Sequence, residues 1–127
     1  MTWPAVAALA LALAVGLGAF GAHGLRDRLD AYSIGIWEKA VFYHFVHALG
    51  ILLAPLLART GLASPGGAWW ACVLLALGIV FFSGSLYLLA VSGVRWLGAI
   101  TPIGGVLFIA GWLTLAWGVW LGARGIM

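Results

Sequence analysis

The sequence predicts an all-α, polytopic membrane protein, a compact antiparallel bundle of four transmembrane helices forming a single membrane domain over residues 1–127. Two observations predict this fold. Hydrophobic residues make up 65% of the chain and Asp, Glu, Lys and Arg only 7%, whereas soluble domains contain roughly 25% charged residues. Four runs approach the ~20 apolar residues needed to cross the hydrocarbon core, at about residues 2–22, 38–58, 69–91 and 100–122.

The first run is expected to be a retained helix and not a cleaved signal peptide. Residues 1–4 precede it without a Lys or Arg, and the run exceeds the roughly 7 to 15 residues of a signal hydrophobic region. Pro4 suits the first helical turn. Small residues recur at four-residue spacing, which permits close helix packing in lipid, in the rows Ala8/Ala12/Gly16 and Ala10/Ala14/Gly18/Ala22.

The links between the runs predict how the helices are arranged. Residues 25–37 alternate charged side chains with apolar ones, so we expect a short amphipathic helix or ordered loop at the membrane interface between helices one and two. Residues 59–68 have the Gly, Ser and Pro content of a turn. Residues 92–96 are so few that helices three and four must be antiparallel neighbours. Glycines at seven-residue spacing predict a seam along helix four, at Gly104, Gly111 and Gly118.

Charges and tryptophans indicate the membrane borders and the orientation. Links one and three carry four cations, Arg26, Arg28, Lys39 and Arg95, against Arg59 and Arg124 at the other end. The positive-inside rule therefore predicts that links one and three are cytoplasmic. Single cations at helix ends are typical of topology signals, so no nucleic-acid partner is expected. Six tryptophans are expected at span ends, Trp3, Trp37, Trp69, Trp70, Trp96 and Trp120, and Trp112 and Trp117 in packing.

Nearly all unusual polar side chains fall in the leaflet of links one and three. In an antiparallel bundle, the end of helix one, the start of helix two, the end of helix three and the start of helix four meet there. This leaflet gives the candidate polar site, which contains no predicted catalytic residue: His23, Glu38, Tyr43, His44, His47, Ser83, Ser85, Tyr87 and Thr101.

The histidines admit two interpretations. His44 and His47 share a helix face and His23 can approach from helix one, so three imidazoles could bind a metal ion. Alternatively, each histidine hydrogen-bonds a neighbouring carbonyl or hydroxyl and holds helices together. An i, i+3 pair without a cysteine or an embedded carboxylate is a weak metal signal, which favours the second interpretation and a protein without a cofactor.

The remaining polar residues are expected to stabilise helix ends and contacts. Glu38 lies beside Lys39 at the predicted start of helix two, which favours a cap or an ion pair. Thr101 is expected to cap helix four ahead of Pro102. The segment 83–85, Ser-Gly-Ser, is expected to allow close contact and to bond back to the preceding turn. Cys72, the single cysteine, excludes an intrachain disulfide and is expected to pack in helix three.

Several motifs in order resemble those of the domain-of-unknown-function 423 family, small bacterial membrane proteins to which eukaryotic transmembrane protein 256 is similar. The resemblance covers essentially the whole chain and implies four membrane helices in the bacterial inner membrane, with no established activity. The motifs are GAFGAHGL at 18–25, WEKAVFYH at 37–44 with His47 and Ala48, FSGSLY at 82–87, LGAITPIGG at 97–105, and Gly111 with Trp112.

These observations lead to three functional hypotheses. The first is a non-catalytic structural or accessory protein that binds lipid, another membrane protein or a second copy of itself through its polar leaflet and glycine-rich faces. The alternative is a metal or small-molecule binding or transport site built on His23, His44 and His47 with Glu38. A small four-helix transporter is the third, although such proteins normally need an ionisable residue deep in a helix.

Overall fold

The computed structural model describes residues 1–126 and is helical throughout apart from short links. In chain order its elements are α1 (Trp3–His23), α2 (Ala31–Arg59), α3 (Pro65–Gly78), the π-helical turn η1 (Ile79–Ser83), α4 (Gly84–Ser92), the 3-10 helix η2 (Arg95–Ala99) and α5 (Thr101–Ala123). The elements α3, η1 and α4 form one continuous rod, and η2 leads into α5. Four helical stretches are therefore long and apolar enough to cross a membrane, which confirms the predicted fold class.

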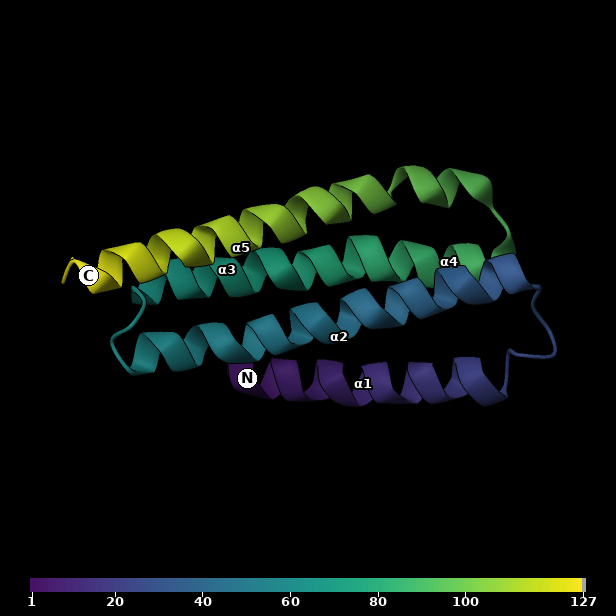
Figure 1. Ribbon diagram of the computed structural model, residues 1–127, viewed down its shortest axis with the longest axis horizontal. Coiled ribbons are helices and arrows are strands. Elements are labelled where there is room, and N and C mark those ends of the chain that lie inside the picture. Colours follow the sequence, from purple (N-terminus) through teal and green to yellow (C-terminus); the bar gives the residue numbers. More distant parts are fainter. Residues whose placement is uncertain (127) are drawn as a thin grey trace.

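The four rods lie antiparallel and side by side in the order α1, α2, α3 to α4, and α5, with both chain ends at the same end of the molecule (Figure 1). Helix α1 packs almost entirely on α2, whereas α2 also contacts α3 and α4, and α5 packs mainly on α3. The helix α1 is thus the outermost element on one side. The main core sits between α2, α3 and α5, around Ile51, Cys72 and Leu75, which are fully buried.

The glycine seam predicted along the fourth span is present, and it faces α3 and η1 of the same chain, a choice of neighbour that the glycine spacing left open. Gly104, Gly111 and Gly118 are buried. A β-carbon at Gly104 would collide with the backbone of Phe82, and one at Gly118 would lie 3.2 Å from the α-carbon of Gly67. Close approach of the backbones requires glycine at these positions. On α1, by contrast, the row Ala8/Ala12/Gly16 is exposed, and self-association through it stays a prediction.

The second helix begins seven residues earlier than expected. Asp30 is its N-cap, and a side-chain oxygen of Asp30 accepts a 2.8 Å hydrogen bond from the Ser33 N–H. This cap lets residues 31–37 form the first two turns of α2, so the link between α1 and α2 is confined to residues 24–30. The third and fourth spans are likewise longer than the apolar runs, at Pro65–Ser92 and Arg95–Ala123.

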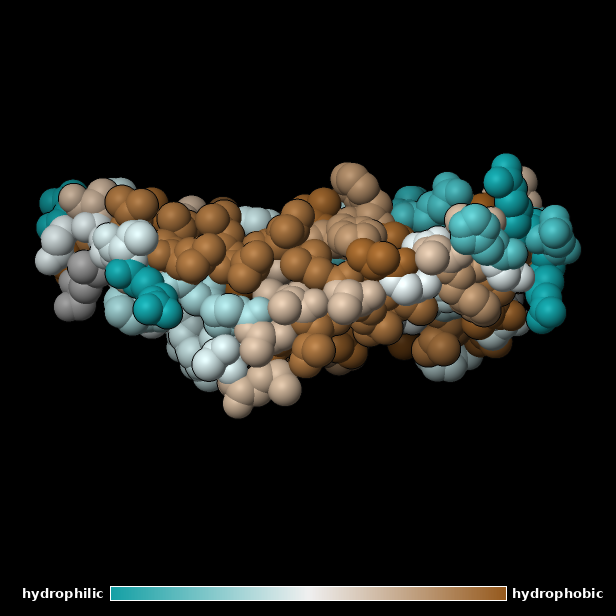
Figure 2. Space-filling view, turned by 90° about the horizontal axis from the view of Figure 1, so that it is seen from below, coloured by the Kyte–Doolittle hydropathy of each residue, from teal (hydrophilic) through white to brown (hydrophobic). Residues whose placement is uncertain are grey.

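The outer surface of the rods is an apolar belt with polar ends (Figure 2). Large side chains such as Leu9, Val80, Val106 and Leu113 point outward and are more than half exposed. A soluble protein would bury such residues, but lipid tails solvate them. Two tryptophans differ from expectation: Trp37 is buried between α1 and α2, and Trp117 is exposed beside Trp120, whereas Trp112 packs as predicted.

Candidate functional site

His44 connects α2 to α4 within the polar cluster. Its side chain is buried, and its Nδ1 atom lies 2.9 Å from the phenol oxygen of Tyr87 on α4. His44 and Ala10 of α1 line the same apolar cleft. His44 therefore ties α4 to α2 through Tyr87, on the side of α2 that faces α1.

His47 makes contacts through a ring nitrogen and through the face of its ring. Its Nδ1–H donates a 2.7 Å hydrogen bond to the carbonyl of Tyr43, one turn earlier in α2. Its ring stacks on Phe108 of α5 with a centroid distance of 3.5 Å and an interplanar angle of 10°. The ring of Tyr43 packs against Phe82 at 4.5 Å. His47 and Tyr43 thus face α5 and η1, whereas His44 faces α1 and α4.

The three histidines do not converge. His23 is the last residue of α1 and is exposed, while His44 and His47 are buried on diverging sides of α2. Among residues 1–126, no three His, Cys, Asp or Glu side chains lie close enough together to hold a metal ion. The predicted trio of imidazoles is therefore not assembled in the structure.

Three hydroxyl groups connect the η1 region to its neighbours. Ser83, fully buried, donates a 2.8 Å hydrogen bond to the carbonyl of Ala40 on α2. Ser85 donates to the carbonyl of Phe82 at 2.9 Å, in the preceding turn as expected, and its oxygen lies 2.7 Å from the Thr101 hydroxyl. Since Ser85 donates its one proton to Phe82, Thr101 is the donor in that contact.

The predicted hydroxyl cap at Thr101 is wrong. The N-cap of α5 is Ile100, which makes no side-chain cap, and the N–H of Ile103 bonds to the carbonyl of Ile100. The 3-10 helix η2 runs directly into α5, so its carbonyls take the place of a capping side chain. The Thr101 hydroxyl is thereby free to bond Ser85. Close contact at this level comes from Gly104 and not from Gly84, whose surroundings are open.

The π-helical turn explains why Ser83 and Ser85 face different neighbours. The N–H of Gly84 bonds to the carbonyl of Ile79, five residues earlier. Such a turn adds one residue to the helix and rotates the residues after it, and it occurs often at functional sites. Here it directs Ser83 to α2 and Ser85 to α5. No sequence pattern marks a π turn, so its position could not be predicted.

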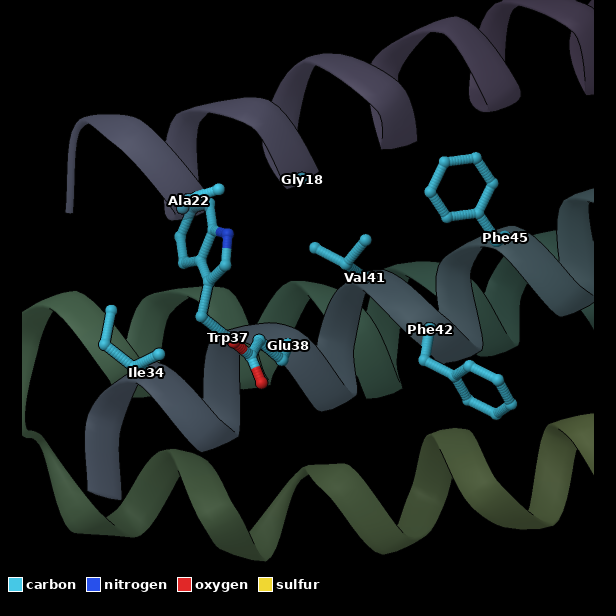
Figure 3. Close-up of a pocket in the computed structure, with 9 residues that line it drawn as sticks. Gly18, Ala22, Ile34, Trp37, Glu38, Val41, Phe42 and Phe45 are labelled. Carbon is cyan, nitrogen blue, oxygen red and sulfur yellow. The ribbon is translucent and has the colours of Figure 1, made fainter. Parts of the chain in front are cut away.

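Glu38 is not a helix cap, because Asp30 holds that position eight residues earlier. It lies in the third turn of α2, is exposed, and borders a groove of about 320 Å³ between α1 and α2. Figure 3 shows Trp37, Val41 and Phe45 reaching from α2 toward α1, with Glu38 beside Trp37. The groove is lined by Gly18, Gly21, Ala22, Ile34, Trp37, Glu38, Val41, Phe42 and Phe45.

Small residues on α1 and a fixed tryptophan on α2 shape this groove. The indole N–H of Trp37 donates a 2.8 Å hydrogen bond to the carbonyl of Leu17. A β-carbon at Gly21 would collide with the Trp37 ring, so glycine lets the indole enter. The residues of the groove other than Glu38 are glycine, apolar or aromatic. Of the groove residues, only Glu38 was predicted from the sequence to belong to a site. The signal for the rest was Asp30 three residues before Ser33, which marks a helix start and so places Ile34 and Trp37 on α2 opposite α1.

Two further hollows lie near the candidate polar residues. An apolar cleft of about 410 Å³ separates α1 from α3 and α4, and its polar members, His44 and Tyr87, are bonded to each other. A polar hollow of about 610 Å³ lies at the end with links one and three, between Tyr32 and Ser33 on α2 and Arg95 on η2. The α1–α2 groove differs from both because it combines an apolar body with one carboxylate.

The fold and the site define a small four-span membrane protein whose embedded polar groups are paired inside the bundle. The chain belongs to the DUF423 family, since residues 17–105 match the model described as "Protein of unknown function (DUF423)". A UPF0382 membrane protein of Staphylococcus epidermidis is 57% identical over 108 residues, covering 85% of this chain and 86% of that protein. UPF0382 membrane protein YwdK of Bacillus subtilis is 49% identical over 105 residues, 81% and 83% of the two chains. No solved structure matches this one.

Proposed function

We propose that the protein is a non-catalytic accessory protein of the bacterial inner membrane that binds a lipid molecule in the groove between α1 and α2. The observation that carries the proposal is the pairing of the candidate polar residues. His44, His47 and Ser83 hydrogen-bond Tyr87 or backbone carbonyls. Within residues 1–126 no buried side-chain nitrogen or oxygen lacks a partner. The buried members of the cluster are thus engaged in hydrogen bonds that stabilise the bundle, which supports a structural role for them over a catalytic one.

The shape and lining of the groove support a lipid as its occupant. Its volume of about 320 Å³ is within the range of ligand sites, roughly 300 to 1,000 Å³. Its body is apolar, as an acyl chain requires, and its one charged residue, Glu38, lies toward the polar end of the molecule that carries links one and three. An apolar groove with a charge at one end matches an amphiphile lying parallel to the helices.

The test is to count the lipid molecules that stay with the purified protein. The chain is extracted from bacterial membranes, washed with delipidating detergent, and its bound lipid is measured by mass spectrometry. We expect a stoichiometric lipid on the wild type. Ala22→Phe should reduce it severalfold, because Ala22 is exposed and lines the groove.

The matched control places the same ring on the other face of α1. Ala12 is exposed and lies outside the groove, so Ala12→Phe should retain the lipid. Wild-type protein that releases all lipid on washing contradicts the proposal. Equal retention by the Ala12 and Ala22 variants would show that lipid binds elsewhere.

A further inference from the structure

Glu38 lies near the boundary between lipid head groups and acyl chains. The 21 residues of α1 rise about 31 Å, which equals the roughly 30 Å thickness of the hydrocarbon core. Glu38 faces the same groove as Gly18, Gly21 and Ala22, in the last turn and a half of α1. Its carboxylate is therefore within several ångströms of the hydrocarbon edge.

A carboxylate at this depth requires a partner. Charged groups at a membrane span are costly unless they pair with an opposite charge or reach water. The groove itself supplies no cation, because its other lining residues are glycine, apolar or aromatic. Trp37, the one other lining residue with a polar hydrogen on its side chain, donates it to Leu17. A cationic partner of Glu38 therefore has to come from outside the groove lining.

The neighbouring residue narrows the chemistry of this partner. Lys39 follows Glu38 and is exposed as well, so adjacent positions of α2 present a carboxylate and an ammonium. A zwitterionic head group presents the complementary pair, an ammonium and a phosphate. An anionic head group would place its only charge against Glu38, and a soluble cation would leave the apolar groove empty.

Resting on the proposed function, we infer that the bound lipid is an aminophospholipid with the chemistry of phosphatidylethanolamine. Its primary ammonium pairs with Glu38, its phosphate lies near Lys39, and one acyl chain follows Val41 and Phe45 between α1 and α2. A primary ammonium is favoured over a quaternary one because it donates hydrogen bonds to the carboxylate, and charge-assisted bonds of this kind are the stronger ones.

The test measures which head group the protein selects. Wild-type chain is reconstituted into nanodiscs of equal parts phosphatidylethanolamine, phosphatidylglycerol and phosphatidylcholine, released by mild detergent, and its bound lipid is quantified by mass spectrometry. We expect enrichment of phosphatidylethanolamine. Glu38→Gln should reduce that enrichment about fivefold, the order expected for one partly exposed ion pair.

Asp27→Asn is the matched control. Asp27 is an exposed carboxylate in link one, at the same end of the molecule as Glu38, but it is absent from the groove lining, so its removal should keep the enrichment. Enrichment of phosphatidylglycerol, or equal enrichment by wild type and Glu38→Gln, overturns the inference yet leaves lipid binding intact. A dimer that buries the groove, detected by native mass spectrometry, overturns it too. Failure of the proposed function is distinct, since the wild type would then hold no lipid of any kind.

The folding of each variant is checked by its far-ultraviolet circular dichroism and by its unfolding in sodium dodecyl sulfate. Glu38 is exposed and forms no helix cap, so Glu38→Gln should unfold like the wild type. The conservative Glu38→Asp supplies a second measurement, because it retains the charge. Glu38→Asp should keep most of the phosphatidylethanolamine enrichment. An enrichment as low as that of Glu38→Gln would count against an ion pair.

Discussion

The phenol oxygen of Tyr87 lies 2.9 Å from Nδ1 of His44, which ties α4 to α2 within an otherwise apolar interior. The aromatic ring of Tyr87 also packs 4.7 Å from that of Trp37, centroid to centroid, and Trp37 in turn bonds to α1. One tyrosine thus connects the buried histidine to the wall of the groove. Stability of the bundle and shape of the groove depend on the same contacts.

Tyr87→Phe should destabilise the protein by about 1 kcal/mol. The change removes the Tyr87 hydroxyl and leaves Nδ1 of His44 buried and unpaired, and interhelical bonds in membranes are worth about 0.6 to 2 kcal/mol. The measurement is reversible unfolding in mixed micelles of increasing sodium dodecyl sulfate. Tyr32→Phe is the control because Tyr32 is 77% exposed. If both variants unfold at the same detergent fraction, the Tyr87–His44 bond contributes nothing to stability.

Gly104→Ala should destabilise the bundle by about 1 to 3 kcal/mol, the usual effect of overpacking. The new methyl group would collide with the backbone of Phe82, which cannot move without shifting η1. The adjacent Gly105 provides the control, since a β-carbon there would meet only a ring atom of Phe82 at 4.0 Å. Gly105→Ala should be neutral or stabilising, because alanine favours helix by about 1 kcal/mol. The same unfolding titration compares them, and the opposite order of stability would be incompatible with the packing of α5 on η1.

The fold could be predicted because a helix that crosses the hydrocarbon core must be apolar along about 20 residues. Apolar length alone defines four spans, and the short link at residues 92–96 made the third and fourth spans neighbours. The heptad glycines Gly104, Gly111 and Gly118 indicated a close helix contact, and the structure makes it with α3 and η1 of the same chain. The exact helix starts were less evident. The charges of Glu38 and Lys39 marked the start of the second apolar run. A helix can extend past the membrane core, however, and the cap at Asp30 decides where α2 begins.

The candidate site was predictable as a region but not as a set of contacts. Antiparallel topology was enough to bring Ser85 and Thr101 together, and the structure joins them at 2.7 Å. Which histidine faces which helix depends on rotations of a few tens of degrees and on the π turn at Ile79–Ser83. His44 and His47 are three residues apart, yet one bonds Tyr87 and the other stacks on Phe108. Sequence spacing cannot resolve such differences.

Acid should loosen the first turn of α2. The Ser33 N–H and hydroxyl hydrogen-bond the Asp30 carboxylate and lower its pKa below the ordinary value of 3.8. A lowered pKa in the folded state means that the stabilisation is present above pH 3.8 and is lost as the pH falls through the lowered pKa. The protection of amides 31–35 from hydrogen exchange, measured relative to the intrinsic exchange rate at each pH, should therefore fall at acid pH in the wild type. Asn at position 30 can cap the helix without ionising, so the Asp30→Asn variant should not lose protection at acid pH. A loss of protection at acid pH in that variant would assign the effect to another group.

Links one and three should face the cytoplasm. Arg26 and Arg28 lie in link one, Lys39 in the third turn of α2, and Arg95 at the start of η2. All four are therefore toward the same end of the rods, opposite Arg59 and Arg124. Asp27→Cys and Val94→Cys report on that end, and Leu62→Cys reports on the exposed turn at the other. In a Cys72→Ala background, a membrane-impermeant maleimide should label the Leu62 position in intact cells and the other two only after the membrane is opened. The reverse pattern would place Glu38 and its groove in the outer leaflet, where the head groups it meets are those facing away from the cytoplasm.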